Sequence, residues 1–202
     1  MTPKPLLTAT AWGAALLMAA CSSARYPTYY ALHVAPDPKP AASDGRRTVT
    51  VAVRRFDTAD YIRQGRIVYR ETPEQVGFYD YHRWAADPGA TVTTAMIDAL
   101  RSARLFSAVV PYDGQERQDW DLRGRLARLD EVDYGGGVRV ETRLVAELVN
   151  RQTGEMLWTG EASETSNIET RTVDSVVGAM SHAVATSIDR LIASMDQQAP
   201  RL

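Results

Sequence analysis

Residues 137–149, GVRVETRLVAELV, alternate between apolar and charged side chains. One face takes Val138, Val140, Thr142, Leu144, Ala146 and Leu148, and the other takes Arg139, Glu141, Arg143 and Glu147. A period of two is the period of a β-strand, and one wet face is typical of antiparallel sheets. The segment therefore predicts an antiparallel strand with one side on a hydrophobic core.

Two further strands flank this segment, over residues 120–133 and 155–163, and short turns at 134–136 and 151–154 connect them to it. The three strands are expected to form a meander. The glycines at 135–137 lack the Lys-Ser/Thr of a phosphate-binding loop and precede a strand, so they are interpreted as a turn.

Shorter stretches in the first half of the chain also have strand character. They are residues 29–34, 48–54, 66–71 and 75–79. The last two are joined by a turn at 72–74, and the proline-rich residues 35–47 are interpreted as a loop or stiff spacer.

Two helices complete the expected fold. Asp87 can cap a helix whose first residue is Pro88, and apolar residues continue at helical spacing to Ala103. Residues 172–195 carry a second apolar stripe, for which covering the dry face of the meander is the simplest role. The expected fold class is α+β, a mostly antiparallel sheet with two helices packed on one face. It forms a single domain over residues 29–196, with a tail at 197–202.

The N-terminal segment has the layout of a secretory signal. Lys4 is its only charged residue, residues 6–20 are apolar or small, and Ala19 and Ala20 precede Cys21. The apolar run is shorter than the roughly 20 residues of a membrane-spanning helix. Residues 1–20 are therefore expected to be removed.

Residues 17–21, LMAAC, resemble the lipobox of bacterial lipoproteins. The resemblance implies diacylglycerol on the Cys21 thiol, cleavage before Cys21, and an acyl chain such as palmitate on the new amine. An ordinary signal cut near a cysteine is the alternative. The residue after the cysteine is Ser22 and not the Asp that retains some lipoproteins at the inner membrane. This resembles the pattern of lipoproteins that are sorted to the outer membrane by default. Residues 21–28 would form the acylated N-terminus and a tether that reaches at most about 25 Å.

Composition limits the function classes. Without residues 1–20 the chain keeps 22 basic and 25 acidic residues, so it lacks the basic surplus expected of a nucleic-acid-binding protein. Its only cysteine is Cys21, which leaves no disulfide to support the core. The remaining 182 residues are enough for one well-buried domain.

Local motifs for chemistry are absent from the sequence. None of His33, His82 and His182 stands at metal-ligand spacing from another ligand type, and no serine lies in a Gly-x-Ser-x-Gly elbow. We expect a protein that is not an enzyme and has no metal and no cofactor besides the lipid on Cys21.

The segment GFYDYHRWAADPG, residues 77–89, is the candidate binding region because aromatic residues and arginine are enriched in protein interfaces. Its candidate partner-binding residues are Tyr79, Tyr81, Arg83 and Trp84. The alternative is that alternate residues fill the core. On that pattern Phe78 and Trp84 would pack inside and the other three would face a partner.

Several stretches together resemble the ABC-transport auxiliary lipoprotein family, the PqiC-like proteins. They are residues 29–36, 51–89 and 100–110, with Tyr61-Ile62 before Ile67-Val68-Tyr69-Arg70 and Arg83-Trp84 before the first helix. The resemblance spans essentially the whole mature chain and implies a small α+β domain. It also implies an association with MCE-domain (mammalian cell entry) proteins and a role in lipid traffic between membranes.

The leading hypothesis is a non-enzymatic outer-membrane lipoprotein that faces the periplasm and docks an MCE protein near that membrane. A regulatory lipoprotein bound to a cell-wall synthase and a direct lipid carrier are the alternatives. A homo-oligomeric ring around a tubular partner would also be compatible with the sequence.

Overall fold

The structure, a computed structural model, describes residues 25–40, 47–115 and 118–198. The predicted signal peptide, Cys21 and residues 199–202 lie outside this part of the chain. Within the described residues, the helices are too short or too polar to span a bilayer.

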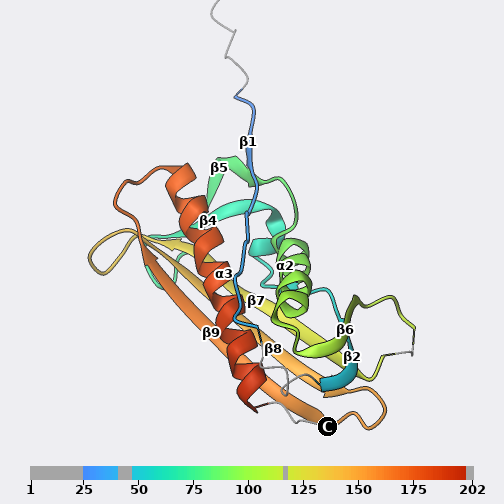
Figure 1. The fold of residues 1–202 in the computed structure, drawn as a ribbon. Helices are drawn as coiled ribbons and strands as arrows, with labels where there is room; N and C mark the ends of the chain where they lie inside the picture. Colours follow the sequence, from blue (N-terminus) through green and yellow to red (C-terminus); the bar gives the residue numbers. More distant parts are fainter. Residues whose placement is uncertain (1–24, 41–46, 116–117, 199–202) are drawn as a thin grey trace, which may run out of the picture.

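A curled sheet and two long helices make up the fold (Figure 1). The strands are β1 (Thr28–Tyr30), β2 (Arg47–Val53), β3 (Asp57–Thr58), β4 (Arg66–Arg70), β5 (Gly77–Trp84), β6 (Phe106–Pro111), β7 (Trp120–Val132), β8 (Arg139–Asn150) and β9 (Met156–Asn167). The helices are α2 (Pro88–Ala103) and α3 (Val173–Gln198), with a short 3-10 helix, η1 (Ile62–Gln64).

The predicted meander is confirmed. β8 pairs antiparallel with β7 on one side and with β9 on the other, over nearly its whole length. Val140, Leu144 and Leu148 of β8 are fully buried, while Arg143 on the opposite face is exposed. The alternation in the sequence thus identified both the strand and its buried side.

The expectation of a mostly antiparallel sheet was wrong, because the sheet is mixed. β2, β3 and β4 all run parallel to β7 along the edge that β8 leaves free. β1 is parallel to β5, and β2 is parallel to β6. Alternation reveals which side of a strand is buried but not the direction of its neighbour. Parallel neighbours need long crossover connections, which only the folded chain reveals.

Both helices pack on the same side of the sheet and against each other (Figure 1). The Asp87 carboxylate accepts a hydrogen bond from the Ala90 backbone N–H at 2.8 Å, so the predicted cap of α2 is confirmed. The apolar stripe of α3 covers the meander, and the helix continues to Gln198, beyond the predicted end at 195.

Other boundaries also differ from the prediction. β1 is only three residues long, β5 extends to Trp84, and β3 and β6 were not predicted. Arg47, expected in the proline-rich loop, is the first residue of β2 and is 1% exposed. Its guanidinium donates hydrogen bonds to the carbonyl oxygens of Met195 and Asp196, which joins the start of β2 to the end of α3.

Candidate functional site at the aromatic end of the sheet

The candidate binding segment lies on β5, which is irregular. Val68 of β4 pairs with Phe78, whereas Arg66 pairs with Arg83. One residue of β4, Ile67, therefore faces the four residues 79–82 of β5. Such a bulge bends a strand and changes the face to which its side chains point. The simple alternation assumed from the sequence consequently fails here.

One side of β5 carries a chain of aromatic contacts. The Tyr79 ring meets the rings of Tyr69 and His82 edge-on, at centroid distances of 5.3 and 5.5 Å. His82 in turn lies 5.5 Å from the Tyr30 ring of β1, and its Nδ1 is 3.1 Å from the Tyr30 hydroxyl oxygen. This chain of rings ties the short edge strand β1 to the body of the sheet.

The predicted core position of Trp84 is confirmed, because this residue is 6% exposed and belongs to the hydrophobic core. Phe78 was also expected in the core, but it is only partly buried. Trp84 offers little surface to a partner, and Tyr79 packs against the core with its hydroxyl held inside the molecule.

That hydroxyl belongs to a buried polar cluster. Tyr79 donates a hydrogen bond of 2.6 Å to Oε2 of Glu131, whose side chain is fully buried on β7. Arg171 Nε donates to the other carboxylate oxygen at 3.0 Å and also pairs with Asp133. Burial first, and the hydrogen bond to Glu131 second, raise the pKa of Tyr79 above its usual value. Both oxygens of the Glu131 carboxylate are therefore paired within the fold, which gives the cluster a structural role rather than a ligand-binding one.

A second buried carboxylate, Asp130, lies beside it in the sequence. Arg70 and Arg128 donate to the same oxygen of Asp130, at 2.6 and 3.0 Å. The Arg70 guanidinium stacks over the Tyr61 ring at 5.4 Å, and burial raises the pKa of Tyr61 to about 12. Tyr61 and Arg70 are in the stretches that carry the family resemblance, and their contacts give them a structural role.

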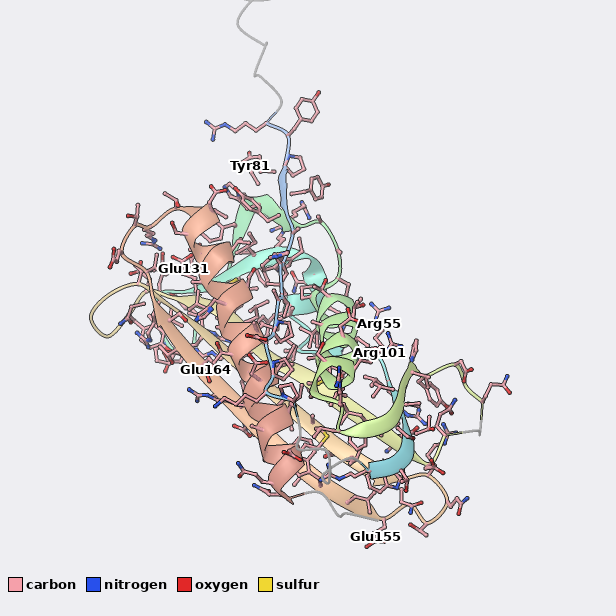
Figure 2. All side chains as sticks on the ribbon, in the orientation of Figure 1. Arg55, Tyr81, Arg101, Glu131, Glu155 and Glu164 are labelled. Carbon is pink, nitrogen blue, oxygen red and sulfur yellow. The ribbon has the colours of Figure 1, made fainter. Side chains whose placement is uncertain are left out.

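The exposed side of this end is a tyrosine surface, which we define as Arg25, Tyr26, Tyr29 and Tyr81. The three tyrosines are 84%, 60% and 43% exposed, and the Arg25 guanidinium lies 5.8 Å from the centroid of the Tyr81 ring. Figure 2 places Tyr81 at the end of the molecule where the described chain begins, and Glu155 at the opposite end.

The sequence analysis found only part of this surface. Tyr81 was among its candidates, whereas Tyr26 and Tyr29 were missed. Their signal was their position, because Tyr26 lies within the predicted tether, residues 21–28, and Tyr29 directly follows it. Arg83 is partly buried and pairs in register with Tyr29, so it borders the surface.

The described residues hold no group of three or more His, Cys, Asp or Glu side chains arranged to bind a metal. A depression of about 470 Å³ lies between residues 31–35 and α3, and His33, Asp174 and His182 line it. The apolar residues Ala31, Ala35, Val177 and Ala185 also line this depression.

Comparison with known proteins identifies the family. The model of the ABC-type transport auxiliary lipoprotein component matches residues 30–191. The chain belongs to this family. The auxiliary lipoprotein family is a family of transport components and is not a known enzyme family, and it indicates a membrane-anchored protein of the cell envelope.

Solved structures share the fold of the auxiliary lipoprotein. Protein XCC0632 from Xanthomonas campestris is 17% identical, with a TM-score of 0.72 over 85% of this chain and 96% of that one. The hypothetical protein CT253 from Chlamydia trachomatis is 6% identical, with a TM-score of 0.52 over 75% of this chain and 98% of that one. The search of curated proteins found no match.

Proposed function

We propose that this auxiliary lipoprotein is held in the outer membrane by lipid on Cys21 and docks a periplasmic MCE protein there, as a non-enzymatic subunit of an ABC-type lipid transport system. The family match over residues 30–191 is the observation that carries the proposal. In this role the protein supports lipid traffic between the membranes and the integrity of the envelope.

The anchor in this proposal is diacylglycerol on the Cys21 thiol and an acyl chain on its amine. Two or three acyl chains hold a protein firmly, whereas one binds only marginally. The lipobox supports the attachment, and Ser22 after the cysteine supports sorting to the outer membrane.

The short tether supports a position close to the lipid. Thr28 enters the sheet seven residues after Cys21, a distance of at most about 25 Å. The end with β1 and β5 would then face the bilayer, and the opposite end of the sheet would point into the periplasm (Figure 1). A partner that extends from the inner membrane would reach that opposite end first.

Crosslinking in intact envelopes tests the proposed partner. A tagged copy of the full chain is crosslinked, solubilised in detergent and captured, and the attached proteins are identified by mass spectrometry. An MCE-domain protein is the expected product, and its absence from crosslinked envelopes would overturn the docking role. Recovery of a penicillin-binding protein instead would favour regulation of a cell-wall synthase. Lipid bound to protein cut from its tether would favour a carrier.

A further inference from the structure

In the part of the chain that the structure describes, the exposed aromatic side chains are concentrated at one end. Within the described residues, five large hydrophobic side chains are exposed, and three of them are Tyr26, Tyr29 and Tyr81 of the tyrosine surface. The other two, Val76 and Met156, lie in separate turns or strand ends. Exposed apolar groups that gather in one region, unlike ones scattered singly, mark interaction or membrane-contact sites.

The strand register gathers these side chains. β1 pairs with β5 in parallel, with Tyr29 opposite Arg83. Residues in register on neighbouring strands point to the same face, so Tyr29 and Arg83 share one side of the β1–β5 pair. Tyr81 lies in the bulged part of β5, and it joins this surface through Arg25, whose guanidinium lies 5.8 Å from the centroid of the Tyr81 ring.

The chemistry of the surface fits the headgroup region of a bilayer. A tyrosine ring is apolar and its hydroxyl is polar, so tyrosine is enriched where a protein passes from lipid to water. Arg25 and Arg83 provide cations that can pair with lipid phosphates, and Asp80 is the exposed acidic residue next to Tyr81 in the sequence.

The length of the chain before this surface selects the bilayer as its occupant. Tyr26 follows Cys21 by five residues, which span at most about 18 Å when fully extended. We propose that the tyrosine surface lies against the headgroups of the membrane that holds the anchor and fixes the orientation of the domain on that membrane. This inference rests on the proposed acylation of Cys21. It assigns to lipid Tyr81 and the neighbouring Arg83, which the sequence analysis assigned to a protein partner.

Site-specific photocrosslinking distinguishes the two assignments. The full chain is produced in its native envelope with p-benzoyl-phenylalanine in place of Tyr81, of Tyr29 or, as a matched control, of the exposed Glu155 at the far end (Figure 2). Position 26 provides a further site if either β-strand position impairs folding. After irradiation, membrane and soluble fractions are separated, and the mass of the captured protein is measured.

An added mass of one phospholipid at positions 81 and 29, several-fold more frequent than at 155, is the expected result. If the protein stays in the membrane fraction but position 81 gives only protein adducts, or no lipid adduct above the control, the membrane contact is overturned while the anchor stands. If the protein is found in the soluble fraction, both the anchor and the contact are overturned. The MCE partner is tested separately by the envelope capture described above.

Discussion

The hydroxyl of Tyr79 donates a 2.6 Å hydrogen bond to the carboxylate of Glu131, 52 residues further along the chain. The bond joins the irregular strand β5 to the central strand β7. Arg171, from the segment before α3, donates a hydrogen bond to the other oxygen of the same carboxylate. An aromatic residue that the sequence offered as an interface residue therefore satisfies a buried charge.

Replacing Tyr79 with Phe should destabilise the protein. The substitution keeps the ring but leaves a buried carboxylate oxygen without its donor, which costs about 1–3 kcal/mol. Urea unfolding followed by circular dichroism measures the change in the free energy of unfolding. Tyr81→Phe is the matched control on the same strand, and its exposed position predicts a change within about 0.5 kcal/mol. Equal effects of the two variants would contradict the buried role of Tyr79.

Tyr61 should make the fold sensitive to alkali. Its pKa is raised to about 12 in the folded protein, while the same group in the unfolded chain titrates near its ordinary value of 10. The contribution of the neutral Tyr61 hydroxyl to the free energy of unfolding is therefore fully present below pH 10. It is lost as the pH rises toward 12. Urea unfolding between pH 8 and 11.5 should show a falling free energy of unfolding, with a smaller fall in Tyr61→Phe. The same slope in both proteins would exclude Tyr61 as a source.

The buried guanidinium of Arg47 should matter more than an exposed one. Arg47→Met removes the donors to two backbone carbonyls near the end of α3, at an expected cost of about 1–3 kcal/mol. Arg55→Met is the control, because Arg55 is largely exposed and its ion pair with Asp87 contributes at most about 1 kcal/mol. Hydrogen exchange should be faster in the last turn of α3 in Arg47→Met only. Unchanged exchange there would show that the carbonyls do not depend on Arg47.

Two glycine substitutions should act in opposite directions. A Cβ at Gly124 of β7 would overlap the ring of Phe56, which is 1% exposed and has little room to move. Gly124→Ala should therefore destabilise the fold by about 1–3 kcal/mol. A Cβ at Gly178 of α3 meets no atom within 4 Å, so Gly178→Ala should stabilise the helix by up to about 1 kcal/mol. Thermal unfolding of both variants checks the signs, and a stabilising Gly124→Ala would refute the packing argument.

Features set by neighbouring residues could be predicted from the sequence. The buried face of β8, with Val140, Leu144 and Leu148, follows from local alternation. The start of α2 follows from Asp87 and Pro88. The Asp87 side chain accepts a hydrogen bond from a free backbone N–H of the first turn, and Pro88 stands where a missing N–H costs nothing. In both places the physical cause lies within a few residues of its effect.

Features set by distant contacts could not be predicted. The parallel partners of β7 depend on long crossovers, and the bulge in β5 reorients Tyr79 away from the expected side. Asp130 and Glu131 are consecutive and both buried, which strict alternation excludes. Their arginine partners, Arg70 and Arg171, lie 60 and 40 residues away in the sequence, so only the fold reveals the pairing.

Cys21→Ala tests the anchor on which the proposed position depends. Without the thiol no diacylglycerol can be attached, so the chain should be released from the membrane fraction or stay unprocessed with residues 1–20 attached. Fractionation of envelopes and the intact mass of the protein distinguish these results. Ser22→Ala is the control, because it leaves the thiol in place and should keep the chain processed and membrane-bound. A Cys21→Ala protein that is still processed and still anchored would contradict the lipobox interpretation. In that case the membrane attachment would have to come from elsewhere in the chain, with the tyrosine surface as the first region to examine.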